Sequence, residues 1–325
     1  MISNKEIESI YGKQSSSDNS FTAKARLLQS IWRVENEFQI GIGPNKSSID
    51  KKTGLPTYSG NMIFEGENNG NNFFYPQTFE YAKRRVKEKK KVETIDDYRL
   101  NNNLLSSMPM AFNLFHPLMM LQVQKPVVLD KMIQNAFPYF PIYKVKEVGL
   151  EFIPTPVENY TNDKSAMDAF ISFWDKDGGE HIIAIETKYT DSLGTNTSSD
   201  KVFDKQIDIL RNLILFTPEA IDKLTEREIP ISQIYRNFIL TEKYRQVHGL
   251  KDSYSIILAP KNHPSTVGEI RSLKQYLKNE VSYKLTDYKL EDFVSALISY
   301  CPVEYLGWLN WFNDRYLNFD RLNKL

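Results

Sequence analysis

The chain has a single cysteine, Cys301, among its 325 residues, so it can hold neither an intramolecular disulfide nor a zinc site built from several thiolates. Such poverty in cysteine is typical of proteins that work in a reducing compartment. No apolar run approaches the roughly 20 residues needed to cross a bilayer, and the first residues lack the basic and apolar regions of a secretory signal. We therefore expect a cytoplasmic protein that has no membrane partner.

The sequence also lacks an excess of charge of either sign, because 41 Lys and Arg residues balance 41 Asp and Glu residues. Proteins that coat DNA are usually strongly basic, so the composition gives no support for nucleic-acid binding. It does not exclude a nuclease, since a cation-binding centre uses several carboxylates and a basic footprint can be local. The 4 histidines show no spacing typical of metal ligands.

Hydrophobic periodicity predicts a mainly helical first half. Helices are expected at about residues 22–38, 77–91 and 111–122, with a long loop rich in Gly, Asn, Ser and Pro after the first of them. The polar first twenty residues are expected to fray. The basic run KRRVKEKKK at residues 83–91 is typical of a solvated helix face, with contact to a phosphate backbone as the alternative.

The second half alternates short strands with helices. Strands are expected at about residues 143–154, 166–174, 181–189 and 254–260, and helices at about 200–216, 231–246 and 290–300. This order predicts an α/β protein with a mixed sheet and helices on its faces. We expect a helical region at residues 1–140 packed on a core at 141–325, or both joined in one continuous domain.

The strand that ends in Glu186, Thr187 and Lys188 carries the chemistry. Residues 181–185 are apolar on both faces, which indicates a central strand covered on both sides. Side chains alternate along a strand, so Glu186 and Lys188 leave the same face. The preceding strand begins near Asp168. Symmetric pairing about a loop at residues 175–180 would put Asp168 opposite Thr187, and a shift of one residue would put it beside Glu186 or Lys188.

Two carboxylates and a lysine in one small patch suit phosphodiester hydrolysis. Carboxylates a few ångströms apart repel each other unless a hard cation such as Mg²⁺ lies between them. The cation stabilises charge on phosphate oxygens and lowers the pKa of a bound water, and a lysine offsets further anionic charge. Glu151, on the first expected strand, is another carboxylate that could approach this edge. The structural alternatives are a surface hairpin with a salt bridge and a solvent-facing Glu151.

The segment SAMDAFISFWDKDGGEHIIAIETKYTD resembles the core of the PD-(D/E)XK nuclease superfamily, which includes many restriction endonucleases and repair nucleases. The resemblance implies a restriction-endonuclease-like mixed β-sheet flanked by helices, here with an N-terminal helical elaboration. It also implies that Asp168 and Glu186 bind the metal together with the backbone carbonyl of Thr187, and that Lys188 orders the attacking water. Met167 stands where the name of the superfamily has proline.

A narrower resemblance, to a restriction-endonuclease-like bacterial group, covers most of the chain. Its blocks occur here in the same order: RLLQSIWRVE, NNLLSSMPMAFNLFHPL, VGLEFIPTP, AMDAFISF, IAIETKYTD, QIYRNFIL and YSIILAPKNHP. The group implies that Glu151, Gln233 and Arg236 lie near the site, and we expect Gln233 and Arg236 to contact a phosphate of the substrate or to support the site. An ordinary polar helix face is the alternative for Gln233 and Arg236, which share one face. Asn113 and His116 are weaker candidates for lining the site.

These patterns and the family resemblance together predict a DNA endonuclease of the restriction, defence or repair type that depends on Mg²⁺, with Mn²⁺ as a substitute. The choice of nucleic acid as substrate follows mainly from the resemblance. A homodimer fits this prediction, because enzymes that cut both strands often dimerise. One alternative is an inactive nuclease fold that binds nucleic acid or protein. Another is a metal-dependent hydrolase of small phosphoesters.

Overall fold

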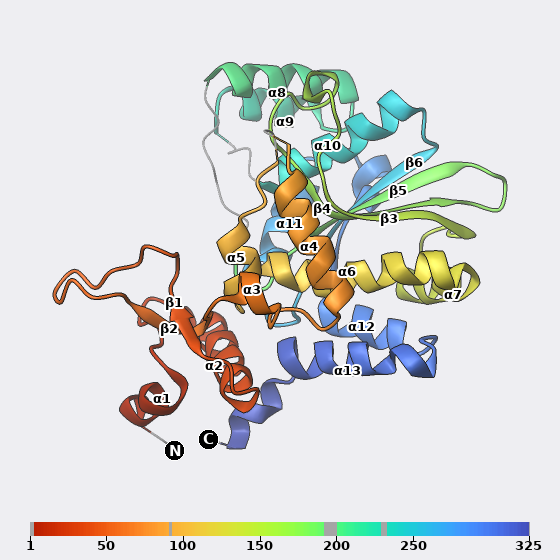
Figure 1. Ribbon diagram of the computed structural model, residues 1–325. Helices are drawn as coiled ribbons and strands as arrows, with labels where there is room; N and C mark the ends of the chain where they lie inside the picture. Colours follow the sequence, from red (N-terminus) through yellow and green to blue (C-terminus); the bar gives the residue numbers. More distant parts are fainter. Residues whose placement is uncertain (1–2, 91–92, 192–199, 229–232, 325) are drawn as a thin grey trace.

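The computed structural model describes residues 3–90, 93–191, 200–228 and 233–324. Within this part of the chain the centre is a mixed sheet of five strands in the order β3, β4, β5, β6, β7 (Figure 1). Its strands are β3 (Lys144–Phe152), β4 (Met167–Trp174), β5 (Glu180–Thr187), β6 (Asp252–Ala259) and β7 (Leu285–Lys289). The first three are antiparallel neighbours, whereas β5, β6 and β7 run parallel. The protein therefore has an α/β fold, and its mixed sheet is of the restriction-endonuclease-like kind.

Helices cover both faces of the sheet. On one face, α6 (Ser107–Gln124) and α7 (Pro126–Ala136) form a core with Ile183 and Ile185 of β5. On the other face, Ile182 and Ala184 pack with Leu240 of α10 (Gln233–His248). Alternate side chains of β5 thus face opposite helical layers, as the apolar sequence of this strand predicts. Because β5 and β6 are parallel, the chain between them crosses over through α8 (Asp200–Leu213), α9 (Pro218–Thr225) and α10.

The N-terminal segments lie beside the sheet and pack on the C-terminal helices. They comprise α1 (Asn4–Tyr11), α2 (Ser20–Glu35), β1 (Ile40–Ile42), β2 (Tyr58–Ile63), α3 (Gly66–Asn69), α4 (Pro76–Glu88) and α5 (Asp97–Asn102). The remaining elements are η1 (Val157–Asn159), α11 (Thr266–Lys274), η2 (Asn279–Lys284), α12 (Leu290–Ile298), α13 (Val303–Tyr316) and η3 (Phe319–Lys324). One cluster of buried apolar side chains extends from Ala25 in α2 to Leu317 after α13.

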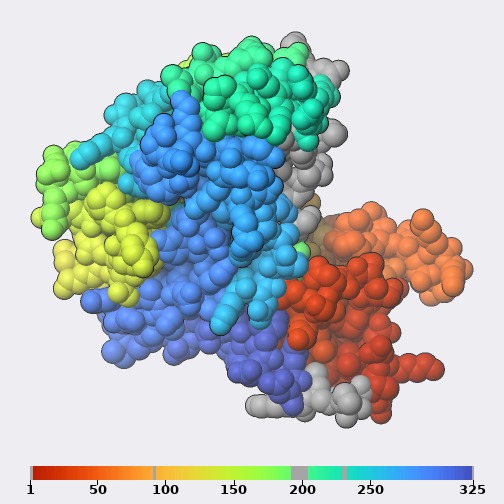
Figure 2. Space-filling model, turned by 180° about the vertical axis from the view of Figure 1, so that it is seen from behind, coloured from red at the N-terminus to blue at the C-terminus, as the bar shows by residue number. Residues whose placement is uncertain are grey.

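Residues 44–57, which we call the arm, form a hairpin between β1 and β2 that stands out from the body of the protein (Figures 1 and 2). Backbone hydrogen bonds join its two sides, from Asp50 to Leu55 and from Thr57 to Ser48. The arm exposes two large apolar side chains, Ile49 and Leu55.

The four predicted strands and the predicted helices are present, with ends that differ by a few residues. The expectation of a frayed N-terminus was wrong, because α1 begins with a capping box in which Ser3 and Glu6 satisfy each other's backbone N–H groups. The expected long loop after α2 was also wrong over part of its length, since it contains β2 and α3. Within the described residues, no helix is long and apolar enough to cross a membrane.

Candidate active site at the end of the central strands

The register of the β4–β5 hairpin determines how the predicted site residues meet. Trp174 pairs with Glu180 and Ala169 pairs with Ile185, so the connecting loop has one residue fewer than symmetric pairing about residues 175–180 requires. One further step along this register puts Asp168 across from Glu186. The first expectation, with Asp168 opposite Thr187, was therefore wrong, and the shift of one residue is what the structure shows.

The shorter loop is fixed by Asp175. Its carboxylate accepts hydrogen bonds from the backbone N–H groups of Asp177 and Gly179, and it also contacts His181 and Lys251. An aspartate that bonds backbone N–H groups a few residues ahead of it stabilises a tight turn. Because of this turn, the second strand of the hairpin starts pairing at Glu180, one residue earlier than the sequence pattern indicated.

Glu151 extends the pair of acids to a row across three strands. We call Glu151, Asp168 and Glu186 the acidic row. Leu150 of β3 pairs with Ala169 of β4, so the next residue, Glu151, lies across from Asp168 as Asp168 lies across from Glu186. Glu151 has a left-handed backbone, with φ of 48°. The structure thus brings together the three carboxylates that the sequence proposed for the site.

Burial and mutual repulsion make the ionised form of these carboxylates costly. Burial, followed by repulsion from Asp168, raises the pKa of Glu151 to about 8 and that of Glu186 to about 7. Burial raises the pKa of Asp168 as well, although the charge of Lys188 opposes the shift. At neutral pH the row therefore retains protons that ordinary carboxylates would have lost, because its own surroundings do not balance the charge of its fully ionised form.

Lys188 and two amides of α10 hold the carboxylate of Glu186. The ammonium of Lys188 lies 2.7 Å from Glu186 Oε1. Burial disfavours the charged ammonium, but attraction by Glu186 and Asp168 raises the pKa of Lys188, so this lysine stays protonated. Gln233 accepts a hydrogen bond of 2.9 Å from Lys188 and donates one of 2.6 Å to Glu186. Asn237 donates to the second oxygen of Glu186.

Asp168 is held from one side only. Its Oδ2 accepts hydrogen bonds from the backbone N–H of Thr187 at 2.8 Å and from the Thr187 hydroxyl at 2.9 Å. Within the part of the chain that the structure describes, its Oδ1 accepts none. Thr187 therefore orients the carboxylate and leaves one oxygen available for a ligand.

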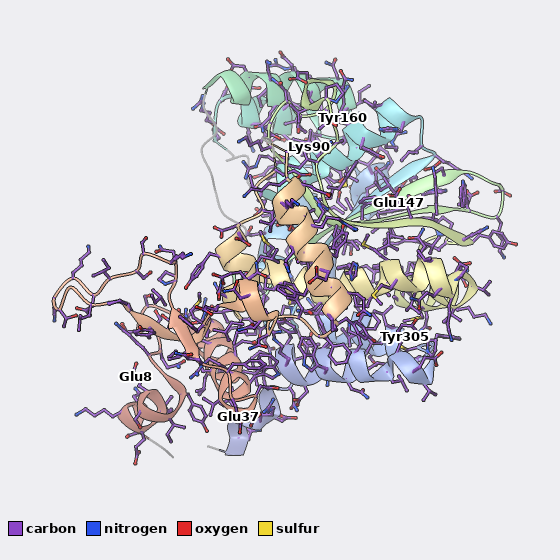
Figure 3. All side chains as sticks on the ribbon, viewed as in Figure 1. Glu8, Glu37, Lys90, Glu147, Tyr160 and Tyr305 are labelled. Atoms are coloured by element: carbon purple, nitrogen blue, oxygen red, sulfur yellow. The ribbon has the colours of Figure 1, made fainter. Side chains whose placement is uncertain are left out.

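Two residues at the site were missed from the sequence. Asn237 lies one helical turn after Gln233, and that spacing was the available signal. Arg85, assigned to a solvated basic face, instead reaches from α4 to β3 and donates to the carbonyl oxygens of Leu150 at 2.7 Å and Glu151 at 2.8 Å. Lys91, at the end of the predicted basic run, lies outside the described residues. Lys90, which precedes it, lies beyond the end of α4 (Figure 3).

Other candidates are not joined to the row of acids. Asn113 hydrogen-bonds to Asn72 and to the backbone of Phe74, and His116 hydrogen-bonds to Thr78, so both serve the packing of α6. Arg236 makes no hydrogen bond to the three carboxylates within the described residues, and its Nε is buried without a hydrogen-bond partner there.

The donor set suits a hard divalent cation. Glu151, Asp168 and Glu186 offer only oxygen atoms, the ligands that Mg²⁺ and Mn²⁺ prefer. A cation between them would offset the repulsion that raises their pKa values. Across the described residues, no three or more Asp, Glu, His or Cys side chains are arranged to hold a metal by themselves. Coordination would therefore draw on backbone or solvent oxygens as well.

The sequence matches the model of a family described as the PD-(D/E)XK nuclease superfamily, over residues 16–318. The chain belongs to this superfamily. No curated protein and no solved structure matches the chain. Membership in the PD-(D/E)XK superfamily implies nuclease activity in general, and nucleases of this kind typically use divalent metals. The match includes the segments that contribute Arg85, Glu151, Asp168, Glu186 and Asn237.

Proposed function

We propose that this protein is a metal-dependent nuclease that hydrolyses phosphodiester bonds in DNA, with Asp168, Glu186, Lys188 and Glu151 at its centre. The observation that carries the proposal is the row of three acids beside a buried, protonated lysine. A structural salt bridge needs one carboxylate for one lysine. Two further carboxylates against the same lysine raise the electrostatic cost of the folded state, which is typical of functional sites.

Each side chain has a separate task. Asp168 and Glu186, with the backbone carbonyl of Thr187, would hold Mg²⁺, or Mn²⁺ in its place. When bound, the cation supplies positive charge to the phosphate oxygens. Lys188 orders the attacking water through its N–H groups and offsets charge that develops on the phosphate. Glu151, whose pKa burial raises above the ordinary value, would accept the proton of that water when it is ionised, since a base works best when its pKa lies near the working pH.

Gln233 supports this centre and contacts the substrate only indirectly. Its amide bridges Lys188 and Glu186, so it sets the distance between the ammonium and the carboxylate. For Arg236 we propose a phosphate contact from the same helix, because the guanidinium is half-buried and its Nε lacks a partner among the described residues. DNA as partner, a homodimer for cutting both strands, and a cytoplasmic location complete the proposal.

The test is cleavage of linear, circular and single-stranded DNA by the purified chain, with and without Mg²⁺ or Mn²⁺. Asp168→Asn and Lys188→Ala should each abolish metal-dependent cleavage. Asp177→Asn is the matched control, because Asp177 is an exposed aspartate in the β4–β5 turn. Undiminished cleavage by Asp168→Asn would overturn the assignment of the site.

A second function, an inactive nuclease fold that binds nucleic acid or protein, is favoured by one observation. Lys188, Gln233 and Asn237 already occupy both oxygens of Glu186, as they would in a purely structural cluster. Calorimetric titration with Mn²⁺ separates the two functions. Metal binding that Asp168→Asn removes supports the nuclease, whereas heat of binding equal in both proteins supports the inactive fold.

A further inference from the structure

A polar cavity of about 650 Å³ adjoins the end of β5. Its walls come from the segment before α2, the base of the arm, β2, and the region around α5. Amide, hydroxyl and guanidinium groups dominate the lining, among them Thr22, Arg26, Asn61, Arg99 and Asn103. The volume lies within the range of about 300–1,000 Å³ that is typical of sites for small ligands or single groups of larger ones.

The cavity lies close to the acidic row. Thr190 and Asp191 belong to its wall, and they follow Lys188 by two and three residues. An extended chain advances about 3.3 Å per residue, so the wall begins within roughly 7–10 Å of Lys188. Arg99 and Asp191, both in the wall, also act electrostatically on Glu151 and Lys188. A polymer cut at the acidic row would therefore reach the cavity within a few of its units.

The polar groups of the lining are held in place and still offer free donors. Asn61 donates a hydrogen bond of 2.8 Å to Asn103 and accepts one from Arg26. The guanidinium of Arg99 pairs with Asp191 through Nη2 and bonds Ser106 through Nε. Within the described residues, its Nη1 and the Nδ2 of Asn103 make no hydrogen bond. A ligand with acceptor oxygens and nitrogens, and with negative charge, fits these donors.

One feature indicates that the ligand belongs to a chain longer than one unit. The arm at the rim carries Lys46, Lys51 and Lys52, all exposed. A free nucleotide would fill the cavity alone, whereas a strand would leave it along the arm, where the lysines offer positive charge to its phosphates.

We propose that the cavity next to Arg99 and Asn103 holds an unpaired nucleotide of the strand that is cut, a few units from the scissile phosphate. This inference rests on the nuclease function proposed above. Amide side chains present a donor and an acceptor, which match the edges of a base. A base that offers its pairing edge to these amides cannot be paired at the same time, so it must leave its stack, which costs least for a single strand. Arg99 is placed to contact a phosphate of that nucleotide.

The experiment measures binding rather than cleavage, so that it stays separate from the test of the nuclease. A fluorescein-labelled single-stranded oligonucleotide of mixed sequence, its duplex, and thymidine 5′-monophosphate are titrated onto the full chain in EDTA. Asn103→Asp keeps the acceptor oxygen that Asn61 and the Leu105 N–H use, and adds a negative charge to the cavity. Asn310→Asp adds the same charge to an exposed position on α13 and is its control.

A second pair of variants tests the space in the cavity. Ser16→Trp fills it from an exposed lining residue that makes no hydrogen bond within the described residues, and Ser295→Trp adds the same ring to the exposed surface of α12. We expect Asn103→Asp and Ser16→Trp each to raise the Kd for the single strand by about tenfold or more. The two controls should bind as the wild-type protein does. Thermal melting of all four variants verifies that they fold.

The outcomes separate the claims. Wild-type affinity in both cavity variants would overturn the inference, as would a wild-type protein that binds no oligonucleotide. Thymidine monophosphate that binds as tightly as the strand would identify a site for free nucleotides and reject the strand. Equal binding of the duplex, equally weakened by both variants, would reject an unpaired nucleotide. The expected binding pattern without any metal-dependent cleavage would reject the nuclease function and leave the cavity assignment intact.

Discussion

Arg85 donates a hydrogen bond of 2.8 Å to the carbonyl oxygen of Glu151, the residue whose side chain joins the acidic row from β3. A second N–H of the same guanidinium donates to the carbonyl oxygen of Leu150 at 2.7 Å. Left-handed backbone costs a residue other than glycine of the order of 1–3 kcal/mol, so it persists only where the surroundings hold it. Arg85 binds the carbonyl group of Leu150, which precedes Glu151, and that of Glu151 itself, so it holds the backbone on both sides of the Glu151 Cα atom. It is therefore a positioning residue for Glu151.

The first prediction concerns Arg85. Arg85→Gln should lower metal-dependent DNA cleavage by about tenfold or more and the free energy of unfolding by about 1–3 kcal/mol, because charged hydrogen bonds to two buried carbonyls are lost. The charge of Arg85 also lowers the pKa of Glu151, so its removal should move the rise of activity to higher pH. Arg84→Gln, at the exposed neighbouring position, is the control. A loss of stability with an unchanged pH profile would show that Arg85 serves folding alone.

The second prediction separates the backbone of Glu151 from its carboxylate. Glu151→Gly and Glu151→Ala both remove the proposed base, so both should lose DNA cleavage. Glycine adopts a φ of 48° without strain, whereas alanine does not. Glu151→Gly should therefore be more stable than Glu151→Ala by roughly 1 kcal/mol in urea unfolding. Equal stability of the two variants would mean that the left-handed backbone is not a property of the protein in solution.

The sequence predicts the acidic row better than it predicts what holds the row. Alternation along a strand sufficed to place Glu186 and Lys188 on one face, because that pattern depends on local geometry alone. The register with Asp168 could not be derived, since it depends on how Asp175 folds the turn. A shift of one residue in that turn decides which side chain meets which across the hairpin.

The residues that hold the acidic row in place were not predicted from the sequence, for a different reason. Arg85 lies far from Glu151 in sequence and within a basic run, so nothing local distinguishes it from its exposed neighbours. Its inward direction follows from the packing of α4 on α6, a tertiary effect. Asn237 could have been predicted from the sequence, because it lies one helical turn after Gln233 and shares the same helix face. The five-stranded sheet was predicted except for β7, a short strand whose register is set by its parallel pairing with β6.

The third prediction tests the amides that hold Glu186. Asn237→Ala removes the donor to one oxygen of a buried carboxylate, so it should lower the free energy of unfolding by about 1–3 kcal/mol in the absence of metal. Saturating Mg²⁺ should reduce this loss, because a cation at Glu186 supplies the missing positive partner. Urea unfolding with and without Mg²⁺ measures both effects. Gln246→Ala, at an exposed position on α10, is the control. A loss that Mg²⁺ leaves unchanged would separate Asn237 from the metal site.

The fourth prediction concerns pH. In the folded chain the pKa of Glu151 is about 8 and that of Glu186 is about 7, against an ordinary value of 4.5. Between these values the folded state binds more protons than the unfolded state. The contribution of these groups to the free energy of unfolding therefore falls as pH rises through this window. Without metal, Tm should drop between pH 5 and pH 8, and Glu151→Gln, which is neutral at every pH, should show a smaller drop.

Metal should reverse this slope, because a divalent cation binds the ionised carboxylates of the folded state and so stabilises that state more as they lose their protons. The increase in Tm on adding Mg²⁺ should accordingly be larger at pH 8 than at pH 5, and Asp168→Asn should remove most of it. Thermal unfolding at the two pH values, in EDTA and in Mg²⁺, gives all the differences in one series. An increase that is equal at both pH values, or that survives in Asp168→Asn, would place metal binding elsewhere. Protonation and metal binding compete at one site only if the acidic row is that site.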